Sequence, residues 1–205
     1  DAPVADPYTG PAILSGPASG VFFHEIFGHR LEGHRLKEGG QTFKKMVGER
    51  VLPVEFQVYC DPLLREYAGT DMKEFLMSRV PLDGFPASNG HGRTSGGGDP
   101  VSRQSNLVIE STRPYSEDEL RAMLVTEARK QGKEYGYYFR TVTSGFTYTG
   151  EGGSLNSFNV TPLEVYRIFV DGRPDQLVRG VDMIGTPLSM FSNITAAGRG
   201  PSVFT

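Results

Sequence analysis

The chain has 205 residues, which is long enough for one domain with a sizeable hydrophobic core. Hydrophobic residues make up 38% of it, and no apolar run approaches the roughly 18 residues that a membrane-spanning helix needs. The net charge of −3 argues against a nucleic-acid-binding domain, which usually carries a basic excess. We therefore expect neither a membrane span nor direct binding to nucleic acid.

The first half of the chain is predicted to carry one long helix and one strand. After an extended entry segment rich in Pro, Ala and Gly, a helix is expected over residues 19–36, ended by Gly39 and Gly40. Residues 51–59 alternate in the manner of a strand, and a short helix is expected over residues 71–77. Residues 81–105 lack periodicity, which over this length is typical of a functional or disordered loop.

The second half is predicted to be rich in strands. Residues 107–111 form a short strand, and Ser116 opens a capping box before a helix over residues 117–132. From Tyr135 onward aromatic and β-branched residues recur with period two, and Asp171-Gly172 is a hairpin turn signal. Four strand-like segments are expected there: 135–150, 156–173, 176–185 and 188–197. The fold class is therefore α+β, with a largely antiparallel sheet or partly closed barrel in the second half and all 205 residues in a single domain.

Other features of the composition bear on where the protein works. The single cysteine, Cys60, excludes a disulfide within the chain, which fits a reducing compartment. No signal-peptide pattern opens the sequence, and the first residue is Asp1 rather than Met. We expect a cytoplasmic location and a fragment or processed piece of a longer protein.

The chemistry is concentrated in His24-Glu25-Ile26-Phe27-Gly28-His29. Imidazoles bind zinc, and a carboxylate beside them can take a proton from a metal-bound water. The spacing H-E-x-x-x-H is one residue longer than the common H-E-x-x-H. At about 100° per residue, His24 and His29 would lie about 140° apart on a regular helix. A shared metal therefore requires an overwound, kinked or π-bulged helix, and Gly28 would tolerate that distortion.

The motif could also be a coincidence of composition. It follows the apolar run 21–23, at what looks like the buried end of a helix. Burying Glu25 and two imidazoles without partners would be costly, and a metal is one economical way to satisfy all three.

The neighbouring polar residues have two interpretations each. Glu32 lies near Glu25 on the helical wheel and would orient a ligand imidazole or form a surface ion pair with Arg35. His34 is interpreted as a surface residue or a group behind the ligands. His91 would approach the site from its glycine-rich loop or remain exposed to solvent. Cys60 is interpreted as a small buried side chain rather than a ligand or nucleophile.

Residues 24–35, HEIFGHRLEGHR, resemble the H-E-x-x-G-H-x-L-E-G segment of the TldD/PmbA metalloproteases, once called modulators of DNA gyrase. Weaker matches follow in family order along the whole chain, at residues 88–93, 105–107, 158–166, 177–182 and 185–188. The resemblance covers most of the family's C-terminal catalytic domain.

The resemblance implies a zinc-dependent peptidase that acts on unfolded or extended peptides. His24 and His29 match the two histidine ligands, and Glu25 matches the catalytic glutamate. The third family ligand is a cysteine near the C-terminus, which this chain lacks; Cys60 is not at the matching position. Two ligands hold zinc weakly, so one expectation is that the fragment itself is metal-free and inactive. The resemblance also implies a homodimer or a heterodimer with another family member.

A competing hypothesis is a non-catalytic module that binds or dimerises with a partner protein. The aromatic-rich strands over residues 135–169 would supply its surface, and the histidines would be structural. Zinc content separates this hypothesis from the enzyme.

Overall fold

The computed structural model describes residues 1–38, 43–72, 91–94, 97–150 and 157–204. Its main sheet is built on a long hairpin, in which β9 (Tyr135–Thr147) and β10 (Phe158–Phe169) pair antiparallel. Both β11 (Gln176–Val178) and β12 (Met183–Gly185) pair antiparallel with β10. On the other side, β1 (Ala12–Leu14) pairs parallel with β9. The predicted antiparallel sheet of the second half is confirmed, and a strand from the first half joins it.

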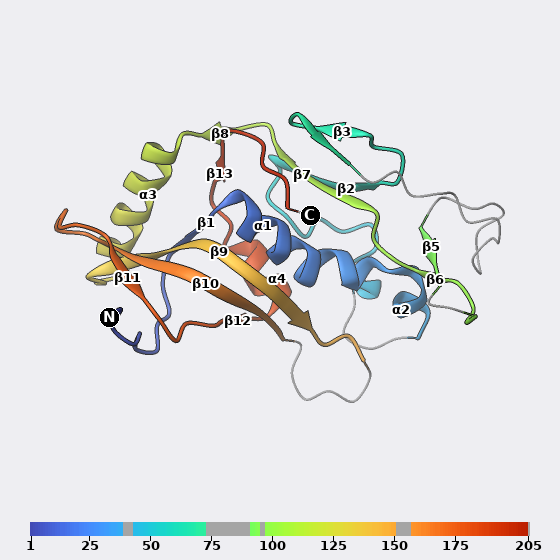
Figure 1. The fold of residues 1–205 in the computed structure, drawn as a ribbon, viewed down its shortest axis with the longest axis horizontal. Coiled ribbons are helices and arrows are strands. Elements are labelled where there is room, and N and C mark those ends of the chain that lie inside the picture. The colour runs from blue at the N-terminus through green and yellow to red at the C-terminus, as the bar shows by residue number, and fades with distance from the viewer. Residues whose placement is uncertain (39–42, 73–90, 95–96, 151–156, 205) are drawn as a thin grey trace.

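A helical run crosses this sheet alongside β9 (Figure 1). It consists of α1 (Gly16–Phe23), a five-residue π-helix (His24–Gly28, here the π-turn), a 3-10 turn (His29–Leu31) and α2 (Gly33–Glu38). The run begins three residues earlier than predicted, because Ser15 caps it by accepting a hydrogen bond from the Ala18 N–H. Residues 39–40, the predicted end, lie outside the described residues.

The core lies between this run and the sheet. Aromatic rings from distant segments meet there: Phe22 packs edge-on against Phe158 of β10, and Phe23 stacks on Phe191. Phe27 and Phe43 also contact Phe191, whose side chain is fully buried. Because Phe22, Phe23 and Phe27 flank the motif residues, hydrophobic burial anchors the helix at the position where the titratable groups occur.

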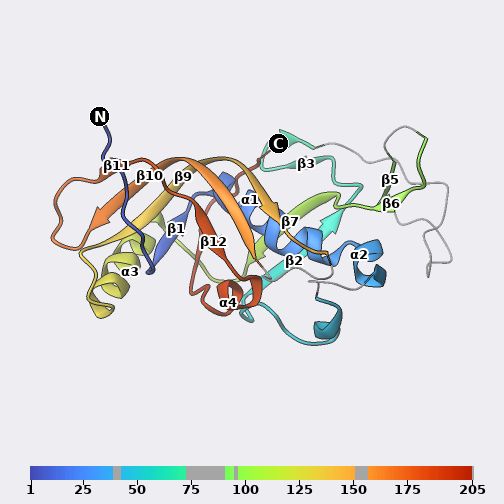
Figure 2. The ribbon, with the colours of Figure 1, turned by 90° about the horizontal axis from the view of Figure 1, so that it is seen from below.

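Phe191 belongs to a short helix, α4 (Pro187–Ser192), where the sequence predicted a strand. That prediction is wrong. Proline at the first helical position presets the backbone, and the buried Pro187 and Phe191 are four residues apart, which is a helical rather than a strand spacing. Figure 2 shows α4 beside β12, where Met190 lies against Gly185.

The other long helix is α3 (Glu117–Lys130). Its predicted capping box is present: the Ser116 hydroxyl accepts from the Glu119 N–H, and the Glu119 carboxylate accepts from the Ser116 N–H. Leu124 and Ala128 are buried, so the apolar stripe is core packing, as predicted.

A second, smaller ladder pairs β2 (Phe56–Asp61) antiparallel with β7 (Asn106–Ser111). The strand predicted over residues 51–59 therefore begins later, and the one over 107–111 is confirmed. Four short strands make hairpins beside this ladder: β3 (Glu66–Tyr67) with β4 (Thr70–Asp71), and β5 (Gly92–Arg93) with β6 (Val101–Ser102).

Two further short strands, β8 (Pro114–Tyr115) and β13 (Ala197–Gly198), pair parallel near α3, and a 3-10 turn spans Lys44–Met46. The helix predicted over residues 71–77 and much of the loop over 81–105 lie outside the described residues, although Asp71 itself is in β4 and the loop contains β5 and β6. The fold class is α+β, as predicted. In the described ranges no helix is long and apolar enough to cross a membrane.

Candidate metal centre

The π-turn brings the two imidazoles of the motif together. The His29 N–H donates to the carbonyl of His24, five residues back, in place of the four-residue bond of an α-helix. The two ring centroids are 4.6 Å apart, and the rings meet edge to face at 75°. Of the three distortions that the H-E-x-x-x-H spacing required, the π-bulge is therefore the one present.

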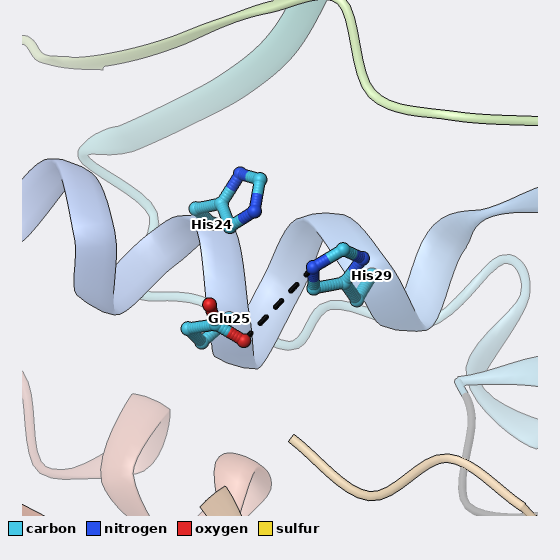
Figure 3. A group of neighbouring side chains, drawn as sticks. All are labelled: His24, Glu25 and His29. Carbon is cyan, nitrogen blue, oxygen red and sulfur yellow. Dashed lines mark ion pairs between the residues drawn. The ribbon is translucent and has the colours of Figure 1, made fainter. Parts of the chain in front are cut away.

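Figure 3 shows His24 and Glu25 on one turn of the helical run and His29 on the next, with an ion pair between Glu25 and His29. One potential ligand atom from each lies within 4.8 Å of the others. In the part of the chain that the structure describes, no other group of three His, Cys, Asp or Glu side chains meets this condition. Imidazole nitrogens suit zinc, and a carboxylate beside them can take a proton from a metal-bound water, so the residues present fit a metal of this kind.

Glu25 is buried, with 8% of its surface exposed, on the side of the run that faces β9. Its Oε2 lies 3.9 Å from His29 Nε2. Burial raises the pKa of this carboxyl above its ordinary value, and nearby His29 opposes the rise. The site thus contains a carboxylate that is a stronger base than one in water.

Gly145 of β9 makes room for Glu25. A Cβ at this position would lie only 2.4 Å from Glu25 Cγ, so any larger residue would displace the carboxylate. No pattern in the sequence indicates this role, because Gly145 is about 120 positions from the motif and only the fold brings the two together.

Glu32 holds the second imidazole. Its Oε1 lies 3.0 Å from His29 Nδ1, while its Oε2 accepts from Arg35 Nε at 2.5 Å and from Arg103 Nη1 at 3.1 Å. Glu32 therefore contacts both His29 and Arg35, but the pair with Arg35 is not on the surface, since Glu32 is only 3% exposed. A hydrogen bond at Nδ1 leaves Nε2 of His29 as the nitrogen that can bind a metal.

Hydrogen bonds from its neighbours offset the effect of burial on the pKa of Glu32. Burial alone would raise the pKa of this carboxyl, but the hydrogen bonds from His29 and Arg35 outweigh it and the pKa is lowered. At His24, partial desolvation and then the neighbouring His29 lower the imidazole pKa. The lowered pKa of His24 favours the neutral imidazole that a metal requires.

Arg30, which the sequence did not single out, is fully buried. Its Nη2 donates to Thr147 Oγ1 at 2.8 Å and to the carbonyls of Tyr148 and Ser157 at 3.2 and 3.3 Å. These acceptors lie at the adjoining ends of β9 and β10, so Arg30 fastens the helical run to the hairpin one residue after His29. Burial, and then the nearby Arg35, lower the pKa of Arg30 to about 10.

The remaining candidates lie around the centre without joining it. His34 is half-buried with Nε2 3.2 Å from Arg103 Nη1, which places it behind Glu32. His91 Nε2 is 3.1 Å from the Ser105 hydroxyl, so this loop histidine does approach the site region. Cys60 is half-buried in β2, where burial raises the pKa of its thiol, and it does not belong to the three-residue group.

A large cleft lies beside the candidate metal centre. Ser105 and the β9 residues Thr143, Ser144 and Gly145 line it together with His24 and Glu25. On the side of β9 that faces β1, the parallel pairing covers only Tyr137–Phe139. Among the described strands, none pairs with that edge of β9 beyond Phe139.

Comparison with known proteins supports the resemblance seen in the sequence. Residues 7–74 match the family described as the PmbA/TldA metallopeptidase C-terminal domain, a range that includes the whole motif and Glu32. No curated protein matches the chain. The family match confirms the resemblance to a TldD/PmbA C-terminal fragment and indicates a metallopeptidase lineage.

Proposed function

We propose that this TldD/PmbA-type chain contributes the metal-binding and catalytic part of a zinc-dependent peptidase that hydrolyses bonds in unfolded or extended peptides. The observation that carries the proposal is the π-turn, which gathers His24, Glu25 and His29 so that one potential ligand atom from each lies within 4.8 Å of the others. A regular helix would hold the two imidazoles about 140° apart.

His24 and His29 would hold the zinc, with Glu32 fixing the orientation of His29. When bound, zinc would polarise the scissile carbonyl and make a water more acidic. Cys60 does not supply the third ligand that the resemblance implies, since it lies outside the three-residue group.

Glu25 is the proposed general base. It accepts a proton from the attacking water and returns it to the amine that leaves as the peptide bond breaks. Its burial supports this role, because a raised pKa makes the carboxylate a better proton acceptor than one in water. Gly145 keeps the carboxylate in place by leaving space for it.

The edge of β9 beyond Phe139, with which no described strand pairs, is the proposed binding site of the substrate. Its residues Thr143–Gly145 line the cleft beside His24 and Glu25, and unpaired strand edges bind extended peptides through main-chain hydrogen bonds. Recognition of this kind depends little on side chains, which agrees with a substrate defined by being unfolded.

The decisive experiment compares Glu25→Gln with wild type in the full-length protein. The amide has nearly the same shape but cannot take the proton, so we expect zinc content to be retained and peptide cleavage to be lost. Replacing His24 or His29 with Ala should remove zinc and cleavage together. Undiminished cleavage by Glu25→Gln would refute the role of Glu25.

The competing hypothesis, a non-catalytic interaction module, loses much of its proposed surface. Tyr137, Phe139 and Phe158 of the aromatic-rich strands are buried in the core, although Phe146 is 65% exposed. The module would nevertheless be supported if the full-length protein contained no zinc. Assembly with a second family member and a cytoplasmic location stay predictions.

A further inference from the structure

The short segment between β6 and β7 contacts the site through consecutive residues. Arg103 reaches Glu32, the residue that holds His29, and Ser105 bonds His91. Between them, Gln104 points at the π-turn itself. Its Nε2 donates to the carbonyl of His24 at 3.2 Å.

This carbonyl is the acceptor that defines the π-turn. It already receives the His29 N–H in the five-residue bond, and a carbonyl oxygen has a second lone pair for Gln104. The bond from Gln104 therefore stabilises the carbonyl of His24 in the position from which it reaches His29 rather than Gly28.

Gly28 allows Gln104 to enter. A Cβ on Gly28 would lie 1.7 Å from Gln104 Oε1 and 2.1 Å from Cδ, so the amide would have to move from its position. The backbone of Gly28 is ordinary right-handed helix, with φ −59° and ψ −53°. The glycine is therefore needed for space and not, as the sequence alone led us to expect, for tolerance of an unusual conformation.

We propose that Gln104 is a positioning residue that holds the π-turn and thereby sets the separation of the His24 and His29 imidazoles. Gly28 is its complement, the gap into which the amide fits. The effect on metal rests on the proposed function, whereas the effect on the π-turn does not. Arg103 and Gln104 then support the two imidazoles separately, one through Glu32 and the other through the His24 carbonyl.

The alternative is that Gln104 merely packs against the helix. Both roles predict some loss of stability when Gln104 is replaced, so stability alone does not separate them. Hydrogen exchange at the His29 amide does, because that N–H makes the five-residue bond.

The main variant is Gln104→Met, which keeps the length of the side chain but removes the donor. In the full-length protein freed of metal, we expect the His29 amide to exchange at least several-fold faster than in wild type, while amides of α3 are unchanged. Gln131→Met, just after the last residue of α3, is the matched control, because among the described residues this side-chain amide bonds only Glu127. Unchanged exchange at His29 would overturn the proposal, whatever the metal content.

Zinc affinity, measured by competition with a chromophoric chelator, tests whether Gln104 sets the separation of the two imidazoles. Loss of a group that orients metal ligands typically costs about 10- to 100-fold in affinity, and we expect a loss in that range for Gln104→Met. Faster exchange with unchanged zinc affinity would show that Gln104 does not set the imidazole separation. A wild type that binds no zinc would refute the proposed function, and the exchange data would still decide the role of Gln104.

Gly28→Ala completes the test. Alone, it should lower the melting temperature, because the methyl group and the Gln104 amide compete for one space. Combined with Gln104→Ala, the clash is gone and the melting temperature should rise above that of the single Gly28→Ala variant, while zinc affinity stays low. Additive losses of stability would contradict the fit between the two residues.

Discussion

His29 Nδ1 lies 3.0 Å from Oε1 of Glu32, a carboxylate that is almost completely buried and has two guanidinium groups on its other oxygen. One imidazole of the candidate centre is thus fixed by a charged network, while the exposed His24 is fixed through its backbone. The two halves of the site can therefore be perturbed independently.

Glu32→Gln should weaken zinc binding by about 10- to 100-fold, the usual effect of losing a partner behind a metal ligand. The amide removes the negative charge that faces Arg35 and Arg103, and its single oxygen can accept either from these guanidinium groups or from His29, but not from both sides. Chelator competition measures the affinity. Glu127→Gln on the exposed surface of α3 is the control, and equal affinities in both variants would contradict the role of Glu32.

Gly145→Ala should reduce catalytic efficiency without removing zinc. The new methyl group would lie 2.4 Å from Glu25 Cγ and 3.0 Å from its Cδ, so the carboxylate must move. A displacement near 1 Å can cost about 100-fold in rate, and we expect kcat/KM to fall by that order. Gly198→Ala, where a Cβ meets only ordinary contacts at 3.4 Å, should leave kcat/KM unchanged. Wild-type kcat/KM for Gly145→Ala would show that Glu25 is not held by this contact.

Arg30→Met should destabilise the protein by about 2–4 kcal/mol, because it removes a buried charged donor shared by three acceptors. Denaturant unfolding gives the free energy. Arg140→Met provides the comparison: its side chain is 58% exposed and pairs with Glu164 at 3.1 Å, an interaction worth less than about 1 kcal/mol. Similar losses in both variants would mean that the buried contacts of Arg30 contribute little.

Ionisation of the Tyr8 hydroxyl should lower the stability of the protein at alkaline pH. Burial, with smaller contributions from Tyr135 and Tyr137, raises its pKa from 10.0 to about 12, and its hydroxyl donates to the Tyr135 carbonyl at 2.8 Å. Between these two pH values the unfolded chain releases the proton while the folded chain retains it. The stabilisation is therefore complete below pH 10 and is lost as the pH rises toward 12.

The Tyr8→Phe variant isolates this titration. Its free energy of unfolding should fall less steeply between pH 10 and pH 12 than that of wild type. A residual slope is expected, because burial also raises the pKa of Tyr137 and Tyr138. Identical slopes for the two proteins would show that Tyr8 does not titrate in the folded state as described.

Local signals in the sequence predicted much of this fold. The capping box at Ser116 and the period-two pattern after Tyr135 correctly gave α3 and the β9–β10 hairpin, because each depends on neighbouring residues. The strand predicted over residues 188–197 is wrong, because the apolar residues there fit both a strand and a helical period. Pro187, at the first helical position, is the feature that distinguishes the helix. The parallel pairing of β1 with β9 joins residues more than 120 positions apart, which no local pattern encodes.

The candidate site, like the fold, was predictable where it depends on residues close together in the sequence. The spacing of His24 and His29 implied a distorted helix, and a π-turn is present. Gly145, Arg30 and Gln104 were not foreseen, because their roles depend on tertiary contacts across the sheet and the β6–β7 segment. Glu32 was foreseen as a partner of His29 or of Arg35, and the fold buries it so that it is both.

The π-turn also accommodates its extra residue without changing the phase of the residues that follow. Its five-residue bond from the His29 N–H to the His24 carbonyl takes the place of the four-residue bond of a plain α-helix. Deleting Ile26 or Phe27 would restore the H-E-x-x-H spacing and let a plain α-helix hold the two imidazoles in a similar relation. Arg30 and Glu32 would then keep roughly their places on the helical run, and with them their partners on the β9–β10 hairpin and on Arg35. A relative of this chain without the extra residue could therefore keep the same hairpin.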